Sequence, residues 1–424
     1  MWKDSLQIDE SIEKADYHGY DPQSGTDLNE SGDIRIFIQN QDQFLLPSKS
    51  HLYIEGALRK KDGSKYDDDE SEISIINNGF MYLFDRVSYQ ISNQEVEGYT
   101  YPGRATTMKS LLTYPRNYSE GMNFLWSPDT RDSVTDNDGF NERCTYLIKQ
   151  SESNAGSFRF TIPLSNLFGF CKNYDKVIYG VKHELILRRT GEDDEAIYKS
   201  DEMVSGAPKV SEGKVILSRL SSRMPCITPS DAYKVKLYKQ IENRSTLTIG
   251  YLNRQCESIS VPSGTRLDWR LSVTAGAEKP RYIIVGLQND RYNKQTKNTG
   301  LFDHCNISNG YVTLNSERYP KDNLQLDYPN NVYTRSYKML CDYYSDVLGK
   351  EGCPIKLSEY INLYPLIVFN VSKQSERLEN TVIDIKIQLS FRKNVGKDVV
   401  AYALILSDRI IKLQSAGEKM NVVY

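Results

Sequence analysis

The sequence is poor in the residues and motifs on which most catalytic and metal-binding sites depend. Its 424 residues include four histidines, and no two of these are close together in the chain: His18, His51, His183 and His304. The motifs of serine hydrolases, zinc proteases, phosphate-binding loops and dinucleotide-binding folds are all absent. We therefore expect that the protein is not an enzyme, and that it has no catalytic residues, no metal site and no cofactor.

The number and spacing of the cysteines also give no sign of disulfide pairing. The cysteines are odd in number, scattered along the chain and never arranged as Cys-x-x-Cys. This distribution is typical of free, mostly buried thiols and not of a disulfide framework or a zinc site. The seven positions are Cys144, Cys171, Cys226, Cys256, Cys305, Cys341 and Cys353.

Long apolar runs and a strong net charge are lacking as well. No stretch approaches the roughly 18 apolar residues of a membrane-spanning helix, and the formal net charge is −3. The basic doublets Lys60-Lys61, Arg188-Arg189 and Arg392-Lys393 are too short for a nucleic-acid-binding stripe. We therefore expect no sequence-specific binding of nucleic acid. Because Met1–Ser5 has no signal-peptide character, we expect synthesis in the cytoplasm or nucleus without secretion.

Tyrosine is the residue type that is abundant. The 30 tyrosines favour β-strands, and their apolar rings with polar tips suit surfaces that become half-buried on assembly. A β-rich fold alone would also explain them.

Two stretches about two hundred residues apart share the alternating pattern of half-buried strands. In Phe158–Arg189, apolar residues alternate with Arg159, Thr161 and Pro163, and a second alternating run ends on the basic doublet. In Ile355–Lys393, a Leu-Ser turn is again followed by a long alternating run that ends on a basic doublet. We interpret the two stretches as corresponding parts of two similar β-units.

The remaining elements are predicted from the same patterns. Helices are expected at Leu6–Lys14, after Pro102 and after Pro329, and a long surface loop at Arg116–Asn141. The other predicted strands are Ile34–Ile38, His51–Leu58, Phe80–Ile91, Thr145–Ile148, Lys214–Ser218, Lys234–Tyr238, Ser245–Tyr251, Arg266–Val273, Tyr282–Leu287, Tyr311–Leu314, Leu324–Asp327 and Val399–Leu406.

Regularly spaced strands with few helices predict an all-β fold of two tandem eight-stranded jelly rolls, with short helices in the connections. Pro225 and Pro229 mark a joint, because proline should end a strand ladder. The expected domains are an N-terminal arm at 1–30, a first jelly roll at 31–224, a linker at 225–231, a second jelly roll at 232–414 and a C-terminal tail at 415–424.

A few residues invite a functional interpretation, with a structural alternative in each case. His183 occupies an inward position of an apolar strand, which favours a hydrogen-bonded core histidine. Glu184 and Glu195 could be imagined as glycosidase carboxylates, but the sequence cannot set their separation. The acidic run Asp67–Glu70 lacks calcium-loop spacing and favours a solvated loop.

The layout resembles the double jelly-roll major capsid proteins, a lineage that includes adenovirus hexon and the capsid proteins of Polinton (Maverick) elements, adintoviruses and related DNA viruses. The resemblance covers about residues 30–415 and is carried by Ile34–Leu58, Asn77–Tyr114, Phe158–Arg189 and Tyr328–Lys393. It implies homotrimeric, pseudo-hexagonal capsomers that tile an icosahedral shell around double-stranded DNA, and it offers no catalytic residue to transfer.

The resemblance also implies location and partners. The protein would form the virion capsid, with itself as main partner and a penton or minor capsid protein as a second partner. Whether a membrane lies beneath the shell is left open. A host protein domesticated from a viral element would share the fold. The alternative from another class is an intracellular carbohydrate-binding or glycoside-hydrolase β-sandwich. In it, Trp2, Trp126 or Trp269 and the tyrosines would stack on sugars.

Overall fold

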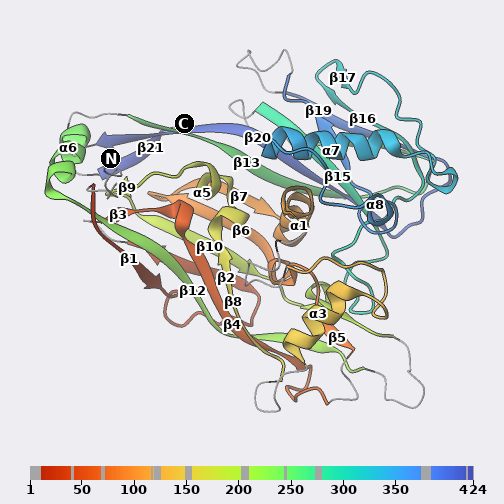
Figure 1. The fold of residues 1–424 in the computed structure, drawn as a ribbon, viewed down its shortest axis with the longest axis horizontal. Coiled ribbons are helices and arrows are strands. Elements are labelled where there is room, and N and C mark those ends of the chain that lie inside the picture. The colour runs from red at the N-terminus through yellow and green to blue at the C-terminus, as the bar shows by residue number, and fades with distance from the viewer. Residues whose placement is uncertain are drawn as a thin grey trace, which may run out of the picture.

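Strands in each half of the chain pair only with strands of the same half, within the described residues, so the chain forms two successive β-units (Figure 1). This computed structural model describes residues 11–39, 43–67, 72–115, 118, 126–148, 155–201, 210–242, 246–272, 279–373, 383–416 and 419–423. No helix within these ranges has both the length and the apolar character needed to cross a membrane.

The first unit has two four-stranded sheets with short additions. One sheet has the order β1-β12-β4-β8 and the other β2-β10-β6-β7. The short strands β3 and β9 extend the first sheet, and β5 pairs with β11. The bounds are β1 Ile12–Tyr20, β2 Gly32–Ile38, β3 Phe44–Leu45, β4 His51–Lys60, β5 Ile73–Ile75, β6 Phe84–Ile91, β7 Gln94–Thr100, β8 Ser157–Pro163, β9 Ile178–Tyr179, β10 His183–Arg189, β11 Ile197–Lys199 and β12 Gly213–Pro229.

The second unit repeats the arrangement. Its sheets have the orders β13-β20-β15-β18 and β14-β19-β16-β17, and β21 adds to β20. The bounds are β13 Leu247–Ser260, β14 Arg266–Arg270, β15 Lys279–Asn289, β16 Ile307–Leu314, β17 Glu317–Tyr319, β18 Ile367–Asn370, β19 Ile385–Phe391, β20 Val399–Ala416 and β21 Lys419–Val423.

The strand order is the same in both units. When the eight main strands of each unit are numbered in chain order, both units have one sheet of order 1-8-3-6 and one of order 2-7-4-5. Two facing antiparallel sheets connected in this way form a jelly roll. The predicted fold of two tandem eight-stranded jelly rolls is therefore confirmed.

The period-two pattern identified in the sequence does separate core from surface. In β8, Phe158, Phe160 and Ile162 are buried, whereas Arg159 is exposed. In β19, Ile385, Ile387, Leu389 and Phe391 are likewise buried. Burying one face of each sheet is what fixes the strand register, because a one-residue slip would move every apolar side chain into water.

Helices occupy the connections between strands. α1 follows β7, and α7 occupies the same connection of the second unit, after β17. The prediction of a helix that opens at Pro102 is confirmed, and the one after Pro329 begins later than expected. The bounds are α1 Pro102–Thr113, α3 Asp138–Leu147, α4 Leu164–Leu167, α5 Gly169–Asn173, α6 Asp231–Glu242, α7 Thr334–Leu348 and α8 Leu357–Asn362, with 3-10 turns η1 Pro47–Lys49, η3 Gly79–Leu83, η4 Asp194–Ala196 and η5 Tyr328–Asn330.

The helix predicted at Leu6–Lys14 is wrong where the structure can be compared with it. Residues 1–10 lie outside the described ranges, and Ile12–Tyr20 forms β1, the first strand of the first jelly roll. β1 pairs along β12, from Ser222 to Pro229. As an edge strand with a mostly exposed face, β1 has no apolar stripe by which the sequence could reveal it.

The prolines do not end the strand ladder, contrary to prediction. β12 continues to Pro229, and Pro225 lies opposite Tyr17 of β1. The carbonyl of Pro225 still accepts a hydrogen bond from the Leu46 amide, 3.1 Å away. A proline lacks only the backbone N–H donor. It is therefore tolerated in a strand where the neighbouring strand does not need that N–H as a hydrogen-bond partner. The domain limits themselves stay predictions.

Other assignments fail for short segments. Lys234–Tyr238 lies in α6, Thr145–Leu147 lies in α3, and Phe80–Leu83 forms a 3-10 turn. Leu324–Asp327 contributes one isolated bridge residue instead of a strand. A four-residue alternation does not distinguish a strand from one helical turn, so packing decides.

The correspondence predicted between Phe158–Arg189 and Ile355–Lys393 is only partly correct. The long alternating runs, β10 and β19, are both seventh strands, so this correspondence is correct. The two Leu-Ser turns are not equivalent, because Leu164 begins α4 after the sixth strand and Leu357 begins α8 before it.

The two units touch along a seam that we define by β7, α1 and α5 of the first unit and β13 and β20 of the second (Figure 1). The backbones approach most closely at Gly169, the first residue of α5. A Cβ atom there would lie 1.8 Å from the carbonyl oxygen of Leu252 in β13. Only a residue without a side chain fits this approach.

We predict that Gly169→Ala lowers the thermal unfolding midpoint, since the added methyl group must push the two units apart. Overpacking of this kind costs about 1–3 kcal/mol. Gly250→Ala is the matched control: this β13 residue has open space around its Cβ position and should change stability by no more than about 0.5 kcal/mol. Equal midpoints for the two variants would contradict the close approach.

Candidate functional site

The four histidines lie in four different environments. His18 is on β1, and His51 begins β4 beside the ring of Tyr17. His183 is completely buried in β10, and His304 stacks on Tyr328 with ring centroids 4.6 Å apart. No cluster of three or more His, Cys, Asp or Glu side chains suitable for a metal occurs among the described residues.

The suggested pair of carboxylates is not a catalytic pair. Glu184 bonds to Arg35 at 3.2 Å, and Glu195 forms a two-point ion pair with Arg104 at 2.7 and 2.8 Å. Each carboxylate is therefore held by its own arginine. Of the acidic run, Asp67 bonds to Lys60 at 3.2 Å, and residues 68–70 lie outside the described ranges.

Trp126 and Trp269, the two tryptophans that the structure describes, are buried and cannot serve as sugar platforms. Trp126 is buried against the edge of Tyr114, with ring centroids 5.1 Å apart, and Trp269 is buried within β14. Trp2 lies outside the described residues. All seven cysteines are free thiols, four of them buried, as predicted.

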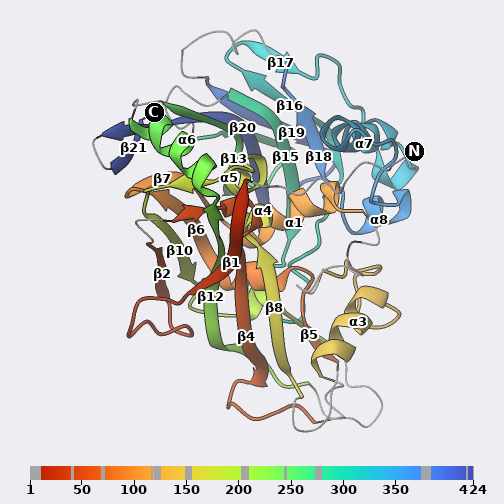
Figure 2. The same cartoon turned by 60° about the vertical axis from the view of Figure 1, so that its left-hand side comes forward.

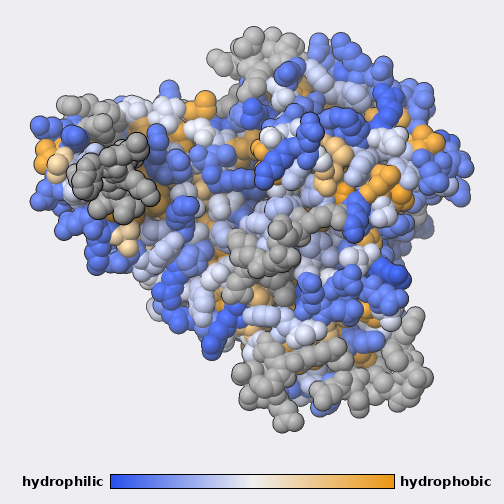
Figure 3. Space-filling view, in the orientation of Figure 1, coloured by the Kyte–Doolittle hydropathy of each residue, from blue (hydrophilic) through white to orange (hydrophobic). Residues whose placement is uncertain are grey.

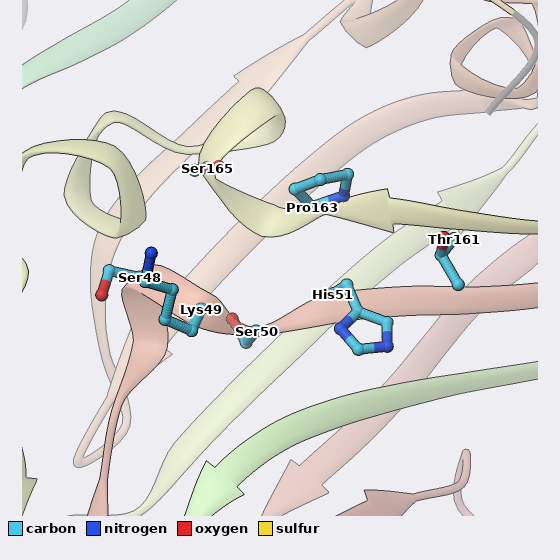
Figure 4. A pocket seen from close by; sticks show the side chains of 7 residues that line it. All are labelled: Ser48, Lys49, Ser50, His51, Thr161, Pro163 and Ser165. Carbon is cyan, nitrogen blue, oxygen red and sulfur yellow. The ribbon is translucent and has the colours of Figure 1, made fainter. Parts of the chain in front are cut away.

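One surface hollow of about 330 Å³ lies at the start of β4 and the end of β8 (Figure 4). Its lining is polar and small: Ser48, Lys49, Ser50, His51, Thr161, Pro163 and Ser165. Burial lowers the pKa of His51, so the ring is neutral near pH 7. The described lining contains no carboxylate and no thiol, and its hydroxyl groups belong to Ser48, Ser50, Thr161 and Ser165.

A second hollow, of about 300 Å³, lies over the strands β14, β16 and β19. Several of its polar groups bond to one another. Arg318 lies 3.8 Å from the ring centre of Tyr311 and bonds to Asn323, and Gln388 bonds to Asp268 at 2.6 Å. These side chains form a network of interactions at the surface.

The unusual chemistry of the molecule lies instead in the seam, where charged side chains are buried. Arg254 of β13 donates to the carbonyls of Ser165, Asn166 and Leu167, and its Nε lies 3.9 Å from the carboxylate of Glu97 in β7. Both side chains are almost fully shielded from solvent. A buried charge is stable only when it is paired and hydrogen-bonded, so each unit supplies what the other needs.

Glu97 also binds the beginning of α5, where the amide of Phe170 donates to it at 2.9 Å. Burial raises the pKa of Glu97, and Arg254 and these amides oppose that rise. Burial also lowers the pKa of Lys109 in α1 well below its usual range. Burial therefore disfavours the charged forms of both Glu97 and Lys109, and the Arg254 guanidinium beside Glu97 opposes this effect for the carboxylate.

A second group of the same kind surrounds Arg104 in α1. Burial alone would lower the pKa of Arg104, but the Glu195 carboxylate more than offsets that effect and the net shift is upward. Across the seam, Arg104 bonds to Gln288 at 3.1 Å, and its guanidinium lies 4.6 Å from the ring centre of Tyr402. The helix is thereby fastened to β15 and β20.

The third group ties the long connections together. Asp129 pairs with fully buried Arg143 at 2.7 Å and accepts from Asn298 of the second unit at 3.0 Å. Arg291 of the second unit bonds to Asp132 at 2.6 Å. These groups were missed in the sequence, because their partners across the seam are at least 87 residues apart and no local motif marks them.

The outer surface carries no large apolar patch on the face shown in Figure 3, where hydrophilic residues dominate and hydrophobic ones form small groups. The buried charged groups lie inside the molecule instead, where they connect the two jelly rolls.

We predict that breaking the buried pair is strongly destabilising. Arg254→Met removes the cation that faces the buried Glu97, and Glu97→Gln leaves Arg254 without its anion. Removing one partner of such a pair costs about 3–5 kcal/mol. Arg270→Met is the control, because its ion pair with Asp384 is exposed on the arginine side and should contribute no more than about 1 kcal/mol. Thermal unfolding midpoints that fall equally in all three variants would contradict this ranking.

His183 is predicted to make the fold sensitive to acid. Its Nδ1 lies 2.9 Å from the Tyr89 hydroxyl, and burial lowers its pKa to about 3. Between about pH 6.5 and pH 3 the unfolded chain binds a proton that the folded chain does not, so stability from this residue is present above pH 6.5 and is lost as the pH falls, by about 1.4 kcal/mol per pH unit.

His183→Asn keeps a side-chain hydrogen-bonding group near Tyr89 and removes the titration. We expect the wild-type midpoint to fall more steeply than that of the variant between pH 6.5 and 4, measured by thermal unfolding. Parallel pH profiles would show that His183 is not the group responsible.

Comparisons with known proteins agree with this architecture. The family model of the double jelly roll-like domain matches residues 73–411. The fold is similar to a chain of the Sputnik virophage solved by cryo-electron microscopy, with a TM-score of 0.65 and 10% identity over 100% of this chain and 91% of that one. A search of curated proteins finds no match.

Two further solved structures are major capsid proteins. The mavirus protein has a TM-score of 0.59 and 12% identity, over 100% of this chain and 92% of its own. The Faustovirus protein has a TM-score of 0.59 and 8% identity, over 98% and 93%. At such identities the likeness shows the fold alone. Together with the family match over most of its length, the matched strand orders of its two units establish that this chain belongs to the double jelly roll-like domain family.

Proposed function

We propose that the protein is a major capsid protein, forming homotrimeric, pseudo-hexagonal capsomers that tile an icosahedral shell of a double-stranded DNA virus or virus-like element. The observation that carries this proposal is the identical strand order of the two units along one chain. The mavirus and Faustovirus major capsid proteins share that fold over nearly their whole length.

The physical argument starts from symmetry. Three copies of a chain with two like units place six like units around one axis, and a ring of six can pack against neighbouring rings in a hexagonal layer. Such a ring needs each chain to be rigid, and the buried ion pairs of the seam supply that rigidity. A virion shell would be the site of action, with a penton or minor capsid protein as a second partner.

A catalytic role has little support in the geometry. The polar groups that are buried in the seam hold one jelly roll against the other, and the two suggested carboxylates are bound by arginines. Two of the platforms proposed for the carbohydrate-binding alternative, Trp126 and Trp269, are buried. We therefore propose a non-enzymatic, structural role related to the capsid proteins of Polinton-like elements.

We predict that the purified chain is a stable trimer of about 146 kDa, three times 48.7 kDa, in size-exclusion chromatography with light scattering. Electron microscopy should show pseudo-hexagonal particles or shells. A clean monomer at all attainable concentrations, particularly one that binds glycans, would refute the proposal.

A further inference from the structure

Two cysteine side chains of the second unit meet beside α7. Cys341 lies within this helix, and Cys353 lies in the connection that leads from α7 to α8. The two thiols are hydrogen-bonding neighbours of each other, and both contact the hydroxyl group of Tyr337, one helical turn before Cys341. Both thiols are free and partly exposed. The fold therefore brings together two groups that oxidation can join.

The path of the chain after α7 explains how the two cysteines meet. The helix ends at Leu348, and Gly349 caps it in the left-handed conformation, with φ 62°. Cys341 lies eight residues before Gly349, which is about 12 Å along the helix axis. The four residues that follow Gly349 can span no more than about 14 Å. This segment is long enough to bring Cys353 back beside Cys341, with little length to spare.

Contacts on the far side of Cys353 hold the arrangement in place. The Tyr337 hydroxyl donates to the carbonyl of Ile355 at 2.8 Å, and the Ile355 side chain is buried. Because a hydroxyl group has one proton, that of Tyr337 faces the thiols as an acceptor. Tyr360 of α8 packs against the ring of Tyr337, with ring centroids 5.3 Å apart, and Figure 2 shows α7 and α8 as neighbouring helices. The cysteines are thus positioned before any bond joins them, so that forming one costs little further conformational entropy.

The other cysteines are placed differently. Four of them are buried, where a dissolved oxidant does not reach them. Cys305 is partly exposed, but the side chains that act on its thiol are those of Asp303 and Arg291. Cys341 and Cys353 combine access to a dissolved oxidant with a second thiol in contact.

We infer that Cys341 and Cys353 form a disulfide bond when the protein meets an oxidising environment, and that this bond fastens the segment before α8 to α7. The oxidant is a small-molecule disulfide, such as oxidised glutathione. The thiolate of one cysteine attacks this disulfide and expels one thiol, which leaves a mixed disulfide on the protein, and the second thiolate then displaces the other thiol. The protein gives up two protons and two electrons, which convert the oxidant into two thiols.

A reversible bond at this place suits a protein that leaves a reducing compartment, because the cytosol keeps thiols reduced. Burial also raises the pKa of Cys353, which disfavours the reactive thiolate and slows closure. Under the proposed function, the chain folds and assembles with open thiols, and the bond closes after release. The bond itself rests on the geometry around α7 and not on the proposed function.

Peptide mapping tests the pairing directly. The full chain is incubated with oxidised glutathione at about pH 8.5, where thiolates are more abundant, and the remaining thiols are then alkylated in denaturant. Trypsin cleaves after Lys338, Lys350 and Lys356, so the two cysteines fall in the separate peptides 339–350 and 351–356. We expect these two peptides to be joined, and dithiothreitol to separate them. Their recovery as separate alkylated or glutathione-bound peptides would overturn the inference.

Thermal unfolding tests whether the bond fastens the second unit. Closing a loop of 13 residues, from Cys341 to Cys353, restricts the unfolded chain, and we expect oxidation to raise the unfolding midpoint by about 3–6 °C. Cys353→Ser should show no such rise, whereas Cys305→Ser, which retains the pair, should respond as the wild type does. Equal responses of the two variants would overturn the inference. Should Cys353→Ser fail to fold, Cys341→Ser takes its place with the same expected result.

The outcomes are independent of the proposed function. Linked peptides from a chain that is a monomer at every concentration would support the inference and refute the proposed function. Unlinked peptides from a trimeric chain would overturn the inference and leave the proposed function standing.

Discussion

The structure depends on the compensation of buried charge between two jelly rolls. Arg254 leaves water to bind three backbone carbonyls of the first unit, and it does so beside the one buried carboxylate, Glu97, that can balance it. Farther along the seam, Arg291 of the second unit pairs with Asp132 of the first. Arg104, whose carboxylate partner Glu195 lies in its own unit, bonds to Gln288 across the seam. Removing one partner of such a pair leaves the other charge buried without compensation, which costs about 3–5 kcal/mol.

This constraint explains why the chain behaves as one body with two similar halves. The seam combines charged groups with a backbone approach at Gly169 that admits no side chain, so the relative placement of the two units is fixed both electrostatically and sterically. A shell built from such bodies inherits the fixed placement. Flexible tethers between jelly rolls would instead leave the angle between neighbouring units undefined, and a regular layer requires that angle to be constant.

The core strands could be predicted because burial of one sheet face imposes a period of two on the sequence. β10 and β19 were recognised as equivalent for that reason, and the fold class followed. The wrong predictions concern segments in which buried and exposed side chains do not alternate regularly. β1 exposes most of its outer face, α6 alternates lysines with apolar residues over less than two turns, and β12 continues through Pro225 because only one hydrogen-bond donor is lost. In each case neighbouring elements, and not the local sequence, decided the conformation.

By itself, the sequence determined that the protein is all-β, that its two halves are built alike, and that it lacks the common catalytic and metal-binding motifs. These are properties of composition and local periodicity. Only the tertiary structure decided which charges are buried together and which surfaces of the two units meet. Those outcomes depend on contacts between residues far apart in the chain, such as Asp129 and Asn298, and such contacts leave no periodic trace in a single sequence.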